Sequence, residues 1–216
     1  MQPPAPPPEA RAGLDRLAAH PDFAGIEAAA GPLPWRRRTP GFPGLLQAIM
    51  GQQISNQAAA AIWRRLAALP GALTPAGLLA LDEETLRGAG LSRPKVSHAR
   101  SLATAYAEGV LDDARIAAMA DDAAIAAICA VRGLGPWTAE VYLLFALERQ
   151  DVFPAGDIAL AGALAHRRGL AERPPTAELR QISTAWTPYR SLAARLLWHH
   201  WRFLTGRPAM DDLPLP

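Results

Sequence analysis

The sequence predicts an all-α protein. Half of its 216 residues are hydrophobic and only 6% are aromatic, and the many alanines, leucines and arginines favour helix. Helical patterns of apolar residues alternate with short Gly/Pro breaks, and no stretch alternates polar with apolar residues for long enough to build a sheet. A chain of this length buries a substantial core as one domain or two small lobes.

The two ends of the chain read as tails. The start, MQPPAPPPEA, is rich in proline, and the end, DDLPLP, is short, so we expect a flexible or polyproline-type segment over residues 1–10 and a second flexible tail over 208–216. The start is neither basic nor apolar enough for a signal peptide, and no apolar run is long enough to span a membrane. We therefore expect a soluble, cytoplasmic protein.

The first core helices flank a short junction. One helix is predicted over 43–50 and the next over 57–69, with Gly51 ending the first and Ser55 capping the second. This leaves Gln52, Gln53 and Ile54 exposed between them. Further helices are expected at 75–80, 82–88, 94–107, 113–119, 121–131, 136–148, 158–168, 176–183 and 188–203.

Two of these helices meet at a very tight turn. Residues 128–140 read ICAVRGLGPWTAE, in which Gly133 and Gly135 break one apolar helical run and Pro136 is favourable in the first turn of the next. The glycines can adopt positive φ and bring bare backbone close to another molecule. Because a helix N-terminus presents unpaired N–H groups, this turn is suited to gripping a phosphate and points to nucleic acid.

Charge and cysteine content narrow the class of protein. A net charge of +2 permits nucleic-acid binding without demanding it, so backbone contacts to phosphates have to supply part of the grip. The single cysteine, Cys129, excludes an internal disulfide and a cluster of cysteine ligands such as an iron–sulfur site.

Four blocks in order carry a resemblance to a known family: AIMGQQIS, GLSRPKVSHA, GLGPWTAEVYLL with DVFPAGD, and WTPYRSLAARLLW. The chain resembles the helix-hairpin-helix DNA glycosylases with a Gly/Pro-rich loop and a catalytic Asp, of the 3-methyladenine DNA glycosylase II type, in a compact form without the N-terminal β-rich domain. The resemblance implies two helical lobes with an active-site cleft between them. Residues 41–148 then form the lobe with the hairpin, and 11–40 plus 149–207 form the other.

The resemblance implies that Asp157 is the catalytic residue. Base removal passes through an oxocarbenium-like sugar, and a fixed carboxylate stabilises that charge and can orient the attacking water. Asp157 also directly precedes the helical stretch from Ile158, where it would serve as an N-cap. Its position alone fits either role, and capping does not forbid catalysis.

Some relatives carry a lysine nucleophile in the second hairpin helix, where this chain has Trp137. The resemblance therefore predicts a monofunctional enzyme that leaves an abasic site and an uncut strand. Trp137 and Trp186 are candidates for stacking on a cationic alkylated purine, with Tyr189 as a further pocket residue. Each of the three also fits ordinary packing between helices.

The resemblance places the DNA wedge at the junction between the first two core helices. Gln53 would fill the gap left by a flipped nucleotide, with Gln52 beside it; capping or bridging of helix ends is the alternative.

Contacts to the DNA backbone are expected from the hairpin and from the block GLSRPKVSHA, at Gly133, Gly135, Thr138, Gly90, Ser92 and Lys95. A solvated helix start fits the second block equally well. In the family a monovalent ion also binds hairpin carbonyls, here those of Arg132 and Leu134; otherwise we expect no metal and no cofactor.

The predicted function is hydrolysis of the N-glycosidic bond of alkylated purines, 3-methyladenine and 7-methylguanine, in double-stranded DNA by a monomer. Two alternatives stay open: a glycosylase for another lesion, such as ethenoadenine, hypoxanthine or a deaminated base, and a non-catalytic helix-hairpin-helix DNA-binding protein. The retained Asp157 argues against the binding module, since a carboxylate near a bound phosphate backbone would repel it.

Overall fold

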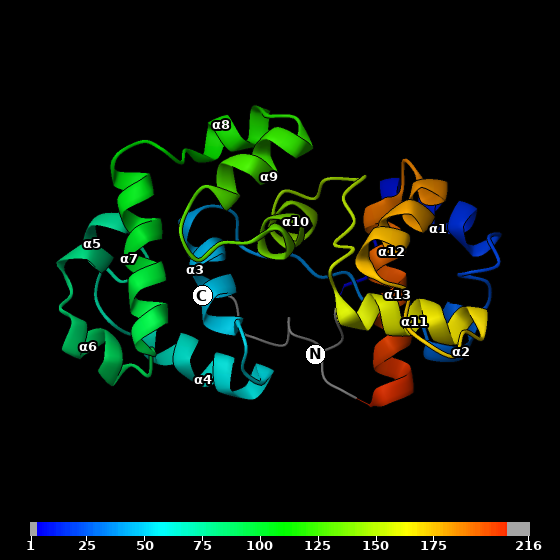
Figure 1. The fold of residues 1–216 in the computed structure, drawn as a ribbon, viewed down its shortest axis with the longest axis horizontal. Coiled ribbons are helices and arrows are strands. Elements are labelled where there is room, and N and C mark those ends of the chain that lie inside the picture. The colour runs from blue at the N-terminus through cyan, green and yellow to red at the C-terminus, as the bar shows by residue number, and fades with distance from the viewer. Residues whose placement is uncertain (1–3, 207–216) are drawn as a thin grey trace. The chain divides into compact units, whose positions relative to one another are not determined.

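A computed structural model of the protein describes residues 4–206. Within this range the chain forms thirteen α-helices and one 3-10 turn, with no strand (Figure 1). The predicted all-α class is confirmed. Among the described residues the helices form two compact units: a terminal unit, residues 4–37 and 148–206, and a central unit, Arg38–Leu147.

The terminal unit is built around its last helix, α13. It contains α1 (Pro8–Ala18), α2 (Ile26–Ala30), α11 (Ile158–Arg168), α12 (Thr176–Ser183), the 3-10 turn η1 (Thr184–Trp186) and α13 (Arg190–Thr205). Helix α13 packs against α11, α2 and α1, and α11 lies beside it in Figure 1. The core of this unit includes fully buried side chains such as those of Leu14, Phe23 and Leu164.

The predicted flexible tail over residues 1–10 is wrong at residues 8–10. Residues 8–10, expected in a flexible tail, form the first turn of α1, and the Trp35 amide donates a 2.8 Å hydrogen bond to the Pro4 carbonyl. The physical reason is that Pro8 occupies the first helical position, where a proline is preorganised and loses no hydrogen bond. Residues 1–3 and the predicted tail at 208–216 lie outside the described residues.

The central unit is arranged around α3, which is buried along almost its whole length. It contains α3 (Phe42–Gly51), α4 (Asn56–Ala67), α5 (Pro75–Ala80), α6 (Glu83–Gly88), α7 (Arg93–Ala107), α8 (Asp113–Ala118), α9 (Asp121–Cys129) and α10 (Pro136–Phe145). Leu45, Leu46 and Ile49 on α3 are inaccessible to solvent. Helix α3 packs on α4, α7 and α10, so the junction at its C-terminal end is held by three neighbours.

Most predicted helices are confirmed to within a few residues. The Ser55 and Ser92 hydroxyls accept hydrogen bonds from Ala58 and Lys95 and cap α4 and α7 as expected. Helix α10 ends at Phe145 rather than 148, and neither α1 nor the short α2 was predicted. Among the described residues, no helix combines the length and apolar character that crossing a membrane requires.

Candidate functional site

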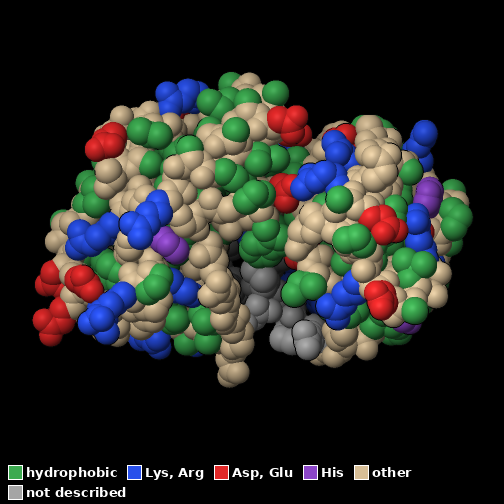
Figure 2. Space-filling view, viewed as in Figure 1, with side chains coloured by type: hydrophobic (Ala, Val, Ile, Leu, Met, Phe, Trp, Pro, Cys, Tyr) green, Lys and Arg blue, Asp and Glu red, His purple; other side chains and the backbone are tan. Residues whose placement is uncertain are grey.

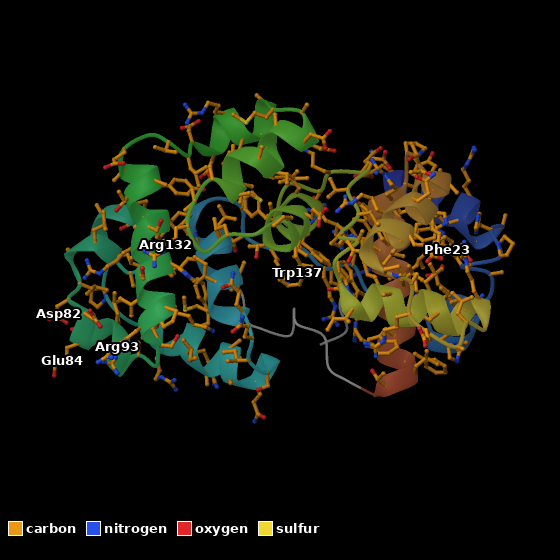
Figure 3. The ribbon with its side chains drawn as sticks, viewed as in Figure 1. Phe23, Asp82, Glu84, Arg93, Arg132 and Trp137 are labelled. Atoms are coloured by element: carbon orange, nitrogen blue, oxygen red, sulfur yellow. The ribbon has the colours of Figure 1, made fainter. Side chains whose placement is uncertain are left out.

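The hairpin turn of the central unit has the predicted form. It joins α9 to α10, Gly133 takes a φ of +94°, and Pro136 is the first residue of α10. No side chain caps the N-terminus of α10, so its positive end is available to an anion. Figure 2 shows basic side chains over α7 on the viewed face of this unit, and Figure 3 labels Arg132 in the same region.

Thr138 lies on the first turn of α10, and the whole residue is 3% exposed. This burial does not favour the predicted contact of Thr138 with a DNA backbone. The half-buried Gly133 and Gly135 keep their main chain near the surface.

Two side chains from outside the hairpin hold the turn in place. Gln52 Nε2 donates a 2.9 Å hydrogen bond to the Gly133 carbonyl, across 81 positions of sequence. The ring of His98, on α7, occupies the space where a Cβ of residue 133 would stand. Position 133 therefore requires glycine for its positive φ and also for the close approach of His98.

The two adjacent glutamines of the α3–α4 junction have different environments. Gln52 is half-buried and committed to the Gly133 carbonyl. Gln53 is exposed and takes a φ of +58°, which is uncommon outside glycine, and Ile54 beside it is 37% exposed. The junction thus presents Gln53 at the surface and uses Gln52 to couple the junction to the hairpin.

Lys95 has a different role from the one predicted. Its side chain is 8% exposed, and its ammonium donates a hydrogen bond to the Met50 carbonyl at the end of α3. Burial lowers the pKa of Lys95 below its ordinary value. The expected phosphate contact is corrected to an internal link between α7 and the C-terminal end of α3, where a cation is favourable.

The predicted second phosphate site has charges of both signs around it. Gly90 and Ser92 line a surface hollow together with Glu83, Glu84 and Arg87, and Figure 3 shows Asp82 and Glu84 near Arg93 at this end of the unit. A phosphate in the hollow would be repelled by the carboxylates and attracted by the guanidinium. The DNA contact of this block stays a prediction beside its alternative, a solvated helix start.

Asp157 is the N-cap of α11 in the terminal unit. Its Oδ1 accepts hydrogen bonds from the Ala159 amide at 2.8 Å and the Leu160 amide at 3.1 Å. The side chain is half-buried, and the neighbouring Ile158 is 69% exposed. The capping role is confirmed, and it fixes the orientation of the carboxylate near the surface.

The segment that carries Asp157 is anchored to the start of α13. Arg190 Nε and Nη2 bind the two oxygens of Asp151 at 2.9 and 3.0 Å. The Ser191 hydroxyl accepts from the Val152 amide and donates to the Val152 carbonyl, both at 3.0 Å. These contacts were not predicted from the sequence, because nothing in the local sequence links positions 39 apart.

The aromatic pocket candidates of the terminal unit are packed in its interior. Trp186 is 2% exposed and makes edge contacts with Phe23 and Phe153, with ring centroids 5.1 and 5.2 Å apart. Stacking of a base on this indole therefore requires its neighbours to move. The Tyr189 ring packs against Gly13 of α1. Trp137, in the central unit, is half-buried. The pocket roles of all three stay predictions, as does an ion at the Arg132 and Leu134 carbonyls.

A family comparison covers both the hairpin and Asp157. The model described as HhH-GPD superfamily base excision DNA repair protein matches residues 46–188. The chain belongs to the HhH-GPD superfamily.

Individual HhH-GPD relatives cover most of the chain. DNA-3-methyladenine glycosylase 1 of Schizosaccharomyces pombe is 29% identical over 73% of this chain and 71% of that protein. The putative DNA-3-methyladenine glycosylase YfjP of Bacillus subtilis is 32% identical over 57% of this chain, which spans only 43% of that protein.

Solved HhH-GPD structures share the whole fold. The DNA-3-methyladenine glycosidase of Bacillus halodurans matches with a TM-score of 0.78 and 29% identity, over 93% of this chain and 92% of that one. The S. pombe 3-methyladenine DNA glycosylase Mag1 in complex with abasic DNA matches with a TM-score of 0.79 over 88% and 95% of the two chains, at 24% identity. The second match concerns the fold alone.

Proposed function

We propose that this HhH-GPD protein is a DNA glycosylase that hydrolyses the N-glycosidic bond of alkylated purines, 3-methyladenine and 7-methylguanine, in duplex DNA. The observation that carries the proposal is a carboxylate, Asp157, fixed by two backbone amides within the region that the family model matches. Support for the substrate class comes from the 3-methyladenine glycosidase of B. halodurans, which aligns over more than nine-tenths of both chains.

The chemistry needs little more than this carboxylate and a water. As the bond to the base breaks, positive charge develops on the sugar, and the fixed Asp157 carboxylate stabilises it electrostatically. The same group orients the water that attacks the sugar. An alkylated purine is already cationic and leaves readily, so the reaction requires no general acid.

The proposed enzyme is monofunctional. Strand cleavage by the lysine-dependent relatives needs an amine that attacks the sugar, and this chain contains a single lysine, Lys95. Its ammonium is bonded to the Met50 carbonyl inside the central unit. The position of the nucleophile in the hairpin is occupied by Trp137, whose indole cannot form a Schiff base.

The DNA contacts in this proposal come from the central unit. The N-terminus of α10 and the hairpin glycines bind a phosphate, and the exposed Gln53 enters the duplex as the wedge while Gln52 holds the junction to the hairpin. One chain carries all of these groups, so we propose that the protein acts as a monomer. The proposed location is the cytoplasm.

Asp157→Asn tests the proposal and separates catalysis from capping. Asparagine caps helices about as well as aspartate, so the variant keeps its fold and its affinity for a duplex with an abasic-site analogue. Single-turnover excision should fall by roughly 10²-fold or more, the range seen on removal of one transition-state stabiliser. Wild-type excision by the variant would refute the catalytic role. Loss of both excision and binding would point to misfolding, which circular dichroism would detect.

A further inference from the structure

The Asp151 carboxylate is held at the N-terminus of α13 by three hydrogen bonds. Arg190 donates to it from Nε at 2.9 Å, from Nη2 at 3.0 Å and from its backbone amide at 3.2 Å. Because Arg190 is the first residue of the 16-residue α13, the carboxylate also lies at the positive end of that helix. Both side chains are about one-quarter to one-third exposed, so solvent screens the pair only in part.

The contact continues along the chain toward Asp157. Ser191 is 4% exposed and binds both backbone groups of Val152, and the Ser191 amide donates to the Gln150 carbonyl at 3.1 Å. Phe153 is then packed on Trp186, and the Asp157 amide donates to the Pro154 carbonyl at 2.9 Å. Every step between the start of α13 and the cap of α11 thus has a defined contact.

We propose that Arg190 and Asp151 are positioning residues for the Asp157 carboxylate. The segment from 151 to 157 has no helix of its own, so its conformation depends on what holds each end. The Arg190–Asp151 pair fixes the first end together with the Ser191–Val152 bonds, and the α11 cap fixes the second. The effect on excision rests on the proposed function; the effect on the conformation of the segment does not.

Arginine is required for this geometry. Its planar fork binds both carboxylate oxygens at once, whereas a lysine ammonium binds as a single point and leaves the carboxylate free to rotate. An error of about 1 Å in the placement of a catalytic group can cost up to roughly 10²-fold in rate. Arg190→Lys therefore keeps the positive charge and loses the two-point contact that orients the Asp151 carboxylate.

The experiment compares Arg190→Lys with a matched control, Arg168→Lys. Arg168 makes an equivalent two-point contact, with both distances to Asp22 at 2.8 Å, but it lies at the far end of α11, about 16 Å along the helix from Asp157. We expect Arg190→Lys to lower the single-turnover rate constant on methylated duplex about tenfold, with the Kd for an abasic-site duplex within twofold of wild type. Arg168→Lys should leave the rate constant unchanged while lowering Tm.

A second measurement does not depend on the substrate. Hydrogen exchange at the Ala159 and Leu160 amides, which bond to Asp157 Oδ1, should be at least fivefold faster in Arg190→Lys and unchanged in Arg168→Lys. Unchanged exchange in both variants would overturn the proposal, as would equal losses of rate in both variants. If the wild-type protein releases no alkylated base, the proposed function fails, and the exchange data still decide whether the pair positions Asp157.

Discussion

Some residues of the candidate site stabilise its conformation, and others are proposed to contact DNA. Asp157 uses one oxygen for both capping bonds, so the carboxylate is oriented before any substrate arrives. Gln52 and Gln53 are neighbours in sequence, yet one bonds to the hairpin and the other is exposed. Lys95 is basic and lies in a block expected to bind DNA, yet its ammonium is buried and donates a hydrogen bond to the Met50 carbonyl.

The Lys95 assignment predicts a specific salt dependence. Lys95→Met should leave unchanged the slope of log affinity for duplex DNA against log salt concentration, because the side chain contacts no phosphate. Arg132 is exposed on the hairpin, and we expect its side chain to contact one phosphate. Arg132→Gln should therefore reduce the slope by about 0.9, the value for one lost phosphate contact. Fluorescence anisotropy titrations at several salt concentrations measure both. A reduced slope for Lys95→Met would restore the original phosphate assignment.

Gly133→Ala should destabilise the central unit. A positive φ costs a residue with a Cβ about 1–2 kcal/mol, and the new methyl group would also overlap His98. Thermal unfolding should show a lower Tm, and the double variant Gly133→Ala/His98→Ala should recover only the overlap part. Equal Tm values for wild type and Gly133→Ala would show that the turn has another conformation.

At the scale of the elements, the ends of the helices form the candidate site. The two features of the central unit proposed to contact DNA are the N-terminus of α10 and the junction between α3 and α4, and Gln52 of the junction bonds to the hairpin turn before α10. Helix α7 supports both, through His98 at the turn and Lys95 at the end of α3. A shift of α7 is therefore transmitted to the hairpin and to the junction together.

The two glutamines should respond differently to alanine. Gln53→Ala should slow excision about tenfold in single turnover, because an unfilled gap lets the flipped nucleotide return to the stack, with little change in Tm. Gln52→Ala should lower Tm by a few degrees and weaken binding to undamaged duplex, since it frees the hairpin carbonyl. If Gln53→Ala excises at the wild-type rate, Gln53 is not the wedge.

At the scale of the whole molecule, the sequence predicted the helices well because glycine, proline and capping residues mark their ends, as Ser55, Ser92 and Asp157 do. It mispredicted residues 8–10, since a proline-rich stretch and a helix start have the same composition there. The Gln52–Gly133 and Arg190–Asp151 contacts join positions 81 and 39 apart, and no local pattern in one sequence encodes such pairings. The hydrophobic pattern also does not distinguish a buried lysine from an exposed one.

The buried His200 of α13 predicts how stability changes with pH. Burial first, then the charges of Arg167, His166 and His199, lower the pKa of His200 from 6.5 to about 4. Between those values the unfolded chain binds a proton that the folded chain excludes, so the free energy of unfolding falls as pH drops from 6.5 to 4, by about 2–3 kcal/mol. Urea denaturation at pH 7, 5.5 and 4 should show this fall, and His200→Gln should make it shallower. An equally steep fall in the variant would assign the effect to other groups.

The central claim is that the protein releases alkylated purines and leaves the strand intact. The most direct measurement incubates the purified protein with methylated duplex DNA and assays the released bases and the strand separately. We predict release of 3-methyladenine and 7-methylguanine, with strand breaks appearing only after alkali converts the abasic sites. Tight binding to an abasic-site duplex without any base release, or strand cleavage by the protein itself before alkali, would contradict the claim.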